Sequence, residues 1–353
     1  MTETKDPGVS FPSKTAYNRV MRAPFILAPM AELSHRALRE LIDAFGGCGE
    51  YYTEMISAGA LVSGGPFESW YLDAGPCPGQ VVYQLAGANA EHLAAAAALL
   101  DRYECAGIDI NMGCSAPAIA RTGAGIRWMN DAERAAAMLA AVREKTRKRL
   151  SVKLRLGPGN TSPEPRPAAS GTDDALFDYL VRFCRRLEEA GAERITLHPR
   201  TGREKFKRRA RWEYVGRLRD SLGIPVAGNG DITGAEDLLR RAAGPCDGVM
   251  AGRGAVRQPW IFAQAAAIEQ GRVWEAPDLE ETALRFLDLL AQYQPPEFHL
   301  SRARRFFGYY CDSFIWGGYL KTLLGREENL AGMGKVLSAH IREHPEERRP
   351  RRT

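Results

Sequence analysis

The sequence predicts a TIM barrel, a (β/α)8 fold of the α/β class, followed by a small all-helical domain. Eight short apolar runs alternate with helix-like segments over roughly 240 residues, the usual size of such a barrel. The runs are almost continuously apolar, as expected of parallel strands that are covered on both faces. Beyond residue 270 only helical patterns remain. Together these three observations favour a closed barrel with a helical appendage.

The predicted elements follow one another in a regular βα order. Strands are expected at 23–30, 50–55, 80–87, 107–113, 150–157, 192–200, 224–231 and 247–255. Helices are expected at 34–45, 90–103, 131–146, 173–191 and 234–244 in the barrel, and at 279–293, 301–316, 318–325 and 330–344 after it. Asp131 is a suitable N-cap for the helix that it begins. A doubly wound open sheet is the competing fold, but it predicts fewer strands and usually an early Gly-x-Gly-x-x-Gly turn, which is absent.

These elements divide the chain into four regions. We expect an N-terminal extension at 1–20, the barrel at 21–272, the helical domain at 273–345 and a basic tail at 346–353. One connection breaks the rhythm, because 157–172 is rich in Pro, Gly and Ser and is expected to be a mobile loop.

Composition narrows the class of protein. The seven cysteines are scattered without a Cys-x-x-Cys pair, so neither a metal site nor a disulfide framework is predicted. The N-terminus is polar and no apolar run approaches 18 residues, which predicts a cytoplasmic protein without a membrane segment. No amphipathic stripe demands an obligate protein partner.

The distribution of positive charge is more informative than the formal net charge of +5. Basic clusters occur at 143–150, 203–212, 301–307 and 346–353. Any one of them is equally well explained as a solvated face or a tail. Four together suit a polyanionic partner such as a nucleic acid.

The chemistry is expected at the carboxyl ends of the strands, where barrel enzymes place their active sites. The polar or glycine residues there are Gln84, Asn111, Cys114, Lys153, His198, Arg200, Asn229, Gly230, Asp231, Gly252, Arg253 and Gly254. The glycine-rich turns after the last two strands suit a phosphate, with Arg253 as its charge partner. An inward lysine such as Lys153 suits a flavin, because a cation near N1 and O2 stabilises the reduced ring. Taken alone, His198 is better interpreted as a hydrogen-bonded core histidine, and Cys114 could be an inert buried thiol, the commonest fate of a cysteine; the combination carries the argument.

At these positions the chain resembles the tRNA-dihydrouridine synthases over residues 20–265. The motifs are APMAELSHRALREL, YYTEMIS, VVYQLAG, DINMGC, VKLRLG, LHPRTGREKFKRRARW, VAGNGDI and MAGRGAVRQPWIF, in this order. The resemblance implies an FMN-dependent enzyme that reduces the C5=C6 bond of a uridine in tRNA, in the D-loop, with NADPH as a transient reductant. Hydride would pass from reduced FMN to C6, and the general acid Cys114 would deliver a proton to C5. A thiol suits that task because it is largely protonated at neutral pH.

The resemblance also assigns binding roles. The residues implied for FMN are Pro29, Met30, Gln84, Lys153, His198, Asn229, Gly230, Asp231, Gly252 and Arg253. Asn111 is implied at the target uracil, which must be extruded from the folded RNA. The residues expected along the tRNA are Arg200, Arg203, Lys205, Lys207, Arg302 and Arg304.

The chain departs from the family pattern in one important place. Ser115 follows the cysteine where the family usually has proline, which would stiffen the loop that aims the thiol. Two other functions stay open: a flavin barrel reductase for a small enone or a dihydroorotate-like substrate, and a non-catalytic RNA-binding relative whose Ser115 loop no longer presents the thiol. The first leaves the basic clusters and the helical domain unexplained. The second predicts RNA binding without reduction.

Overall fold

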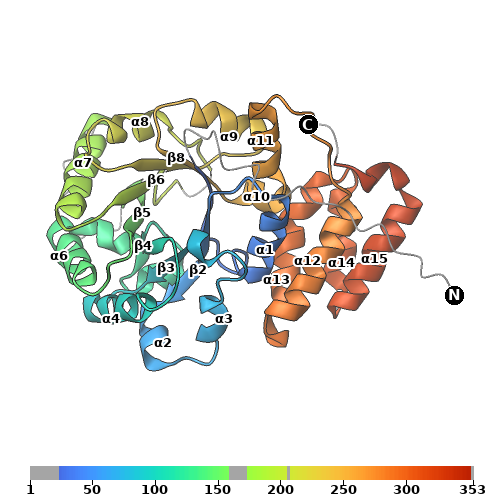
Figure 1. The fold of residues 1–353 in the computed structure, drawn as a ribbon, viewed down its shortest axis with the longest axis horizontal. Coiled ribbons are helices and arrows are strands. Elements are labelled where there is room, and N and C mark those ends of the chain that lie inside the picture. Colours follow the sequence, from blue (N-terminus) through green and yellow to red (C-terminus); the bar gives the residue numbers. More distant parts are fainter. Residues whose placement is uncertain (1–23, 159–172, 205–206, 351–353) are drawn as a thin grey trace.

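The computed structural model describes residues 24–158, 173–204 and 207–350 (Figure 1). Eight parallel strands form a closed barrel in sequence order, with β1 paired to both β2 and β8. The strands are β1 (Phe25–Leu27), β2 (Glu50–Ser57), β3 (Val81–Ala86), β4 (Gly107–Met112), β5 (Leu150–Gly157), β6 (Arg194–Thr201), β7 (Val226–Asn229) and β8 (Gly248–Ala251). The predicted TIM barrel is confirmed, and each strand lies at the predicted place with ends that differ by a few residues.

The register of the barrel stacks polar side chains in layers inside an otherwise apolar sheet. Gln84 on β3 is opposite Asp109 on β4, and Asp109 is opposite Ser151 on β5. One layer further along, Asn111 is opposite Lys153. Because side chains alternate between the two faces of a strand, residues two apart point the same way. The polar layers therefore lead toward the carboxyl ends of the strands.

Helices cover the outside of the barrel. They are α1 (Arg36–Phe45), α2 (Ala58–Ser63), α3 (Glu68–Leu72), α4 (Ala90–Leu100), α5 (Pro117–Arg121), α6 (Ala132–Arg143), α7 (Asp173–Glu189), α8 (Glu213–Arg219), α9 (Ala235–Ala242), α10 (Arg253–Arg257) and α11 (Ile261–Glu269), with 3-10 turns η2 (Pro78–Gln80) and η3 (Gly125–Asn130). The Asp131 carboxylate accepts the Arg134 N–H at 2.9 Å, so the predicted cap of α6 is confirmed. Residues 1–20 and 159–172 of the predicted extension and loop lie outside the described residues.

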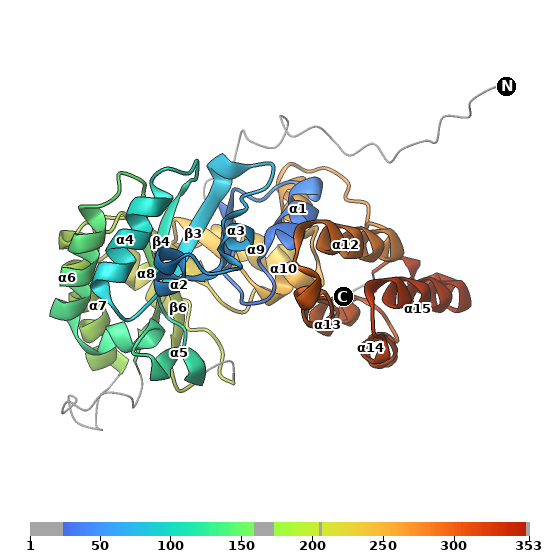
Figure 2. The same ribbon diagram turned by 90° about the horizontal axis from the view of Figure 1, so that it is seen from below.

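The C-terminal helices pack beside the barrel (Figure 2). They are α12 (Leu279–Tyr293), α13 (His299–Tyr310), α14 (Gly317–Arg326) and α15 (Leu330–Glu343), with turns η4 (Pro296–Phe298), η5 (Cys311–Ser313) and η6 (Pro345–Arg348). The single helix expected at 301–316 is instead broken after Tyr310. At the break Gly317 approaches the Cys311 carbonyl so closely that an added Cβ would lie 1.8 Å from its oxygen. The chain can therefore turn back into α14 only with glycine at this position.

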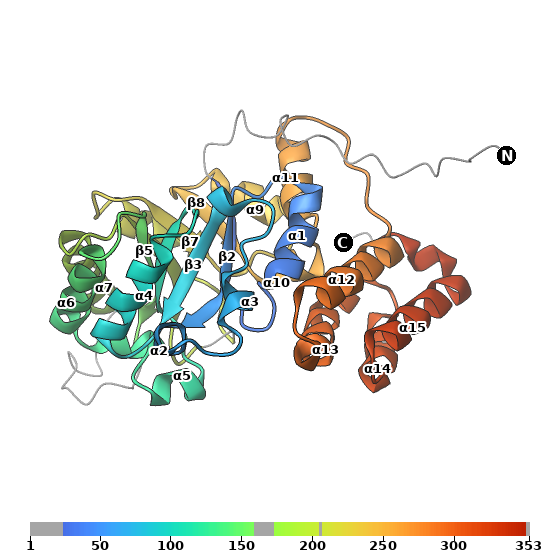
Figure 3. The same cartoon turned by 60° about the horizontal axis from the view of Figure 1, so that its bottom comes forward.

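The seam between the two regions is apolar and aromatic. Trp260 of the barrel meets Tyr310 of α13 edge-on with ring centroids 6.4 Å apart, and α12 packs along α1. The carboxyl ends of the strands face the side on which α2 and α5 lie, and α13 borders that side from the helical region (Figure 3). The barrel mouth therefore has one wall from a second unit. Within the described residues no helix is long and apolar enough to cross a membrane.

Candidate active site

A cavity of about 610 Å³ opens at the carboxyl ends of the strands, between the barrel and α13. Sequence-predicted site residues on its wall are Pro29, Met30, Asn111, Cys114, Lys153, His198, Arg200, Asn229, Gly230, Asp231, Gly252 and Arg253. They come from the ends of β1, β4, β5, β6, β7 and β8 and from the loops that follow. The volume is in the range of a cofactor pocket.

The loop that carries Cys114 is held by hydrogen bonds rather than by a proline. The Asn111 Oδ1 accepts the N–H groups of Gly113, at 3.2 Å, and Cys114, at 2.9 Å. The Cys114 carbonyl accepts the Ile126 N–H at 3.0 Å, and the Gly113 carbonyl accepts Arg155 Nε at 2.8 Å. Gly125 has φ +62°, and a Cβ there would lie 2.6 Å from the Cys114 oxygen. These contacts hold the loop that carries the thiol.

Positive charge dominates the cavity wall. Its described lining carries the cations Lys153, Arg155, Arg200, Arg253, Arg257 and Arg305 and the carboxylates Asp231 and Asp312. Among the described residues Lys153 has no ion-pair partner. Burial, reinforced by Arg155, lowers the pKa of Lys153 to about 8. Such a charge is costly without an anionic partner, so the site is built for an electron-rich or anionic ligand.

His198, Arg200 and Asp231 form a fixed group on one wall. Arg200 donates to both Asp231 oxygens, at 2.6 and 2.8 Å, and lies 3.0 Å from His198 Nε2. A guanidinium can only donate, so Nε2 accepts and the ring proton is on Nδ1. Burial, with the charges of Lys153 and Arg155, lowers the pKa of His198 to about 2, so the ring is neutral. Arg200, predicted to contact tRNA, is thus buried and held by Asp231.

Gln84 lies one layer below the cavity. Its side chain is fully buried, donates to Asp109 Oδ2 at 2.7 Å and accepts from Asn111 Nδ2 at 2.8 Å. Since the Asn111 carbonyl is already taken by the loop, its second amide hydrogen is the part left for a ligand. Gln84 therefore contacts Asp109 and Asn111 and does not line the cavity; its contact with the cofactor stays a prediction.

The basic side chains expected along RNA separate into two groups. Arg203, Lys207 and Arg304 are exposed, whereas Lys205 lies outside the described residues. Arg302 is buried: its guanidinium lies 3.3 Å from the Glu54 carboxylate and 4.9 Å from the Phe298 ring centroid. Its position joins the helical region to the barrel, so Arg302 is not on a surface that RNA can reach. The basic cluster at 143–150 is far from the cavity, because it precedes β5 and therefore lies at the amino-terminal end of the barrel.

Replacing Arg302 with methionine is expected to lower the free energy of unfolding by about 3–5 kcal/mol, because Glu54 is left buried without its cation. Arg304→Met, on the exposed face of the same helix, should change stability by less than about 0.5 kcal/mol but weaken tRNA binding. Urea unfolding and tRNA gel shifts distinguish the two. If the Arg302→Met protein is as stable as the wild type but binds tRNA more weakly, Arg302 contacts RNA after all.

Several cavity residues escaped the sequence prediction. Arg155 is two residues beyond Lys153, so the alternation of β5 was a usable signal for it. Arg305, Tyr309 and Asp312 line the cavity from α13 and η5 at helical spacing. Nothing local in the sequence says that this face meets the barrel mouth, because the packing of the helical region decides it.

Comparison with known proteins gives one consistent relationship. A family model described as dihydrouridine synthase matches residues 26–328. A protein named "Probable tRNA-dihydrouridine synthase" from Rhizobium leguminosarum bv. phaseoli is 30% identical, over 83% of this chain and 87% of its own length. The tRNA-dihydrouridine(16) synthase of Neisseria meningitidis is 29% identical, over 73% of this chain and 75% of its own. The solved histamine dehydrogenase from Rhizobium sp. 4-9 has a TM-score of 0.51 at 14% identity, covering 77% of this chain and 50% of its own, and shares the fold.

Proposed function

Because the chain belongs to the dihydrouridine synthase family, we propose that it reduces the C5=C6 bond of a uridine in tRNA, with FMN as cofactor and NADPH as reductant. The observation that carries the proposal is the meeting of Cys114 and the unpaired Lys153 on the wall of one basic cavity. A thiol supplies a proton and a buried cation stabilises a reduced flavin. A reductase for a small molecule would not need basic residues from the helical region on the wall of its cavity.

The cavity suits FMN by the chemistry of its donors. Lys153, which has no ion-pair partner among residues 24–158, 173–204 and 207–350, would supply a cation for the ring, and His198 and Asn229 lie on the same wall. Gly230, Gly252 and Arg253, at the ends of β7 and β8, would hold the ribityl chain and the phosphate. Pro29 and Met30 would lie against the ring. When bound there, the flavin supplies the hydride for C6 of the uracil.

The part of the protein in the reaction is to deliver a proton to C5 and to hold the base. Negative charge develops toward C5 and O4 as C6 is reduced, so a donor must face C5 from the side opposite the hydride source. The Cys114 loop, fixed by Asn111 and Arg155, provides that donor. The second Asn111 amide hydrogen can donate to a uracil carbonyl. Each role requires the base to be extruded into the cavity.

The tRNA would lie across the barrel mouth and the helical region. Arg203, Lys207 and Arg304 are exposed and would contact phosphates, while Arg305 and Tyr309 are placed to meet the nucleotide entering the cavity. We place the target in the D-loop. Position 16, for which the Neisseria relative is named, is the first to examine.

The proposal is tested by following flavin reoxidation without oxygen. Protein carrying FMN is reduced with NADPH and mixed with tRNA that lacks dihydrouridine, with fully modified tRNA as the matched control. We expect rapid reoxidation by the unmodified tRNA alone. Reoxidation by orotate or a small enone but not by tRNA would overturn the proposal in favour of a small-molecule reductase.

A further inference from the structure

A column of polar side chains runs through the barrel beneath Cys114, and Asp109 is at its centre. Asp109 is completely buried and is not on the cavity wall. Ser151 Oγ donates to one carboxylate oxygen at 2.7 Å, and Gln84 Nε2 donates to the other at 2.7 Å. Asp109 therefore receives hydrogen bonds from both neighbouring strands and touches no reacting group.

The carboxylate fixes the direction of every hydrogen bond above it. Because a carboxylate accepts, Gln84 must turn its NH2 group downward, and its oxygen then faces Asn111. Asn111 must in turn present its NH2 group to Gln84, at 2.8 Å, so its own oxygen faces the loop. That oxygen accepts the Gly113 and Cys114 N–H groups. One acidic group thus determines the orientation of two amides and the anchoring of the thiol loop.

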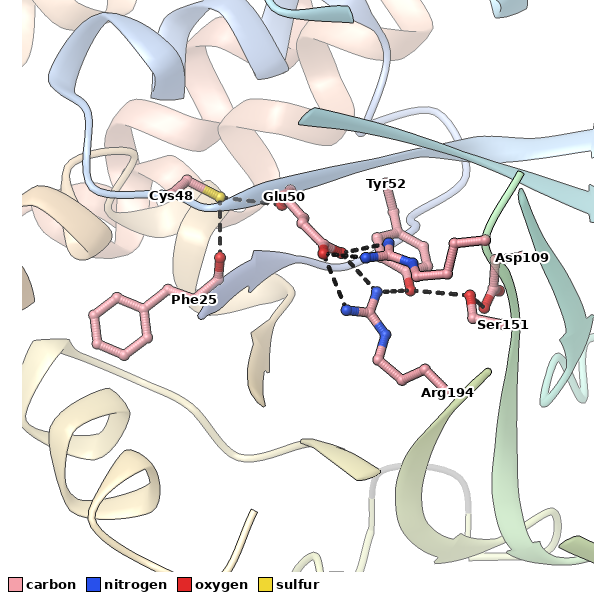
Figure 4. Close-up of polar contacts among 8 residues, drawn as sticks. Phe25, Cys48, Glu50, Tyr52, Asp109, Ser151 and Arg194 are labelled. Atoms are coloured by element: carbon pink, nitrogen blue, oxygen red, sulfur yellow. Dashed lines mark hydrogen bonds and ion pairs between the residues drawn. The ribbon is translucent and has the colours of Figure 1, made fainter. Parts of the chain in front are cut away.

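The lower end of the column is closed by an ion-pair cluster in which one carboxylate is shared by two guanidinium groups (Figure 4). Glu50 pairs with Arg194 at 2.6 Å and with Arg149 at 2.7 Å, and Arg194 also donates to the Tyr52 hydroxyl at 2.7 Å. The Tyr52 hydroxyl lies 3.5 Å from Ser151 Oγ. Polar contacts therefore lead from Arg194 through the Tyr52 hydroxyl to Ser151, which donates to Asp109.

We propose that Asp109 is a positioning residue for Cys114, acting through Gln84 and Asn111. The inference rests on the proposed function, in which the Cys114 thiol must face C5 of a bound uracil. Without proline at position 115, the Asn111 oxygen is a principal anchor of the loop. If Asp109 no longer orients the amides, that anchor is lost, and a displacement of about 1 Å at a reacting group can cost roughly 100-fold in rate.

Two substitutions of Asp109 distinguish its role in orienting the Gln84 amide from the space that its side chain fills. Asp109→Asn keeps an oxygen for the Gln84 NH2 group and turns its own NH2 group toward Ser151, whose hydroxyl can accept. Asp109→Leu removes the acceptor at similar size. We expect the tRNA-dependent reoxidation of FMN to fall about 10- to 100-fold in the leucine variant and to stay near the wild-type rate in the asparagine variant. Because both variants remove a charge that favours protonated Lys153, reduction of FMN by NADPH is measured in parallel, and the expected effect of the leucine variant is the loss in the tRNA step beyond any loss shared with the asparagine variant.

A second readout concerns the thiol itself and does not require tRNA. Iodoacetamide labels the flavin-containing protein at fixed pH, and peptide mass spectrometry reports Cys114 against the partly exposed Cys105 and Cys246. We expect the ratio of Cys114 to Cys246 labelling to change several-fold in Asp109→Leu and in Gln84→Met, but not in Asp109→Asn. Gln84→Met removes the hydrogen bond between Gln84 and Asn111, and it provides the same test if the Asp109→Leu protein does not fold.

The outcomes are distinct. If Asp109→Leu changes neither the ratio of Cys114 to Cys246 labelling nor the rate of tRNA-dependent reoxidation, the positioning role is wrong. It is also wrong if labelling of Cys114, Cys105 and Cys246 changes by the same factor and Tm falls, because the whole protein is then loosened. If the wild-type protein does not reduce tRNA, the proposed function fails, and the labelling ratio still decides whether Asp109 positions the loop.

Discussion

Replacing Cys114 with alanine is expected to slow the reduction of tRNA by about 100- to 10,000-fold, the usual contribution of a general acid. The thiol lies on the cavity wall in a loop anchored by four hydrogen bonds, and the proposed reaction assigns it the proton for C5. FMN content and the rate of flavin reduction by NADPH should be unaffected, because Cys114 serves only the step that involves RNA. Stopped-flow reoxidation with unmodified tRNA measures the loss.

Cys105→Ala is the matched control. This partly exposed cysteine precedes β4, at the opposite end of the strand from Cys114, so its loss should leave the rate unchanged. Cys114→Ser should be intermediate, because a hydroxyl is a weaker acid than a thiol. A Cys114→Ala protein that forms dihydrouridine at the wild-type rate would show that the proton comes from another group.

Replacing Lys153 with methionine is expected to weaken FMN retention and slow its reduction by about 10- to 150-fold. A hydrogen bond to a charged group contributes about 1.5–3 kcal/mol, which corresponds to that range. The same change should stabilise the flavin-free protein by up to about 3 kcal/mol, because lowering the pKa from 10.5 to about 8 reflects the cost of burying the charge. Flavin content and urea unfolding of the apoprotein give the two values.

The lowered pKa also predicts the pH dependence. In the flavin-free protein Lys153 is protonated below pH 8 and loses its charge as the pH rises through about 8, so the affinity of the apoprotein for FMN should decline on the alkaline side. In Lys153→Arg the cation persists, and the decline should disappear. A wild-type affinity for FMN that stays flat to pH 9 and a destabilised Lys153→Met apoprotein would both contradict this role.

Much of the barrel could be predicted because its signals are local. Apolar runs mark the strands, and the composition around Asp131 marks the start of α6. The strand ends then bring Asn111, Cys114, Lys153 and His198 to one mouth by the geometry of the fold alone. The family resemblance supplied their roles.

What the sequence did not reveal depends on contacts between distant residues. Arg302 has the composition of an RNA contact, yet its partner Glu54 is on β2, and only packing of the helical region brings the two together. Arg200 is likewise held by Asp231, on the loop after another strand. Position 115 carries serine, and the amide side chains that hold the loop come from Gln84 on β3 and Asn111 on β4. Alternation along β4 could have pointed to Asp109, which is two residues before Asn111.

The most direct test of the account is the chemical fate of the RNA. Unmodified tRNA is incubated with the FMN-containing protein and NADPH, digested to nucleosides and analysed by mass spectrometry, with Cys114→Ala in parallel. We predict a single dihydrouridine, two hydrogens heavier than uridine, at a D-loop position in the wild-type reaction and almost none with the variant. Intact uridines after complete flavin reduction by the wild-type protein would contradict the central claim.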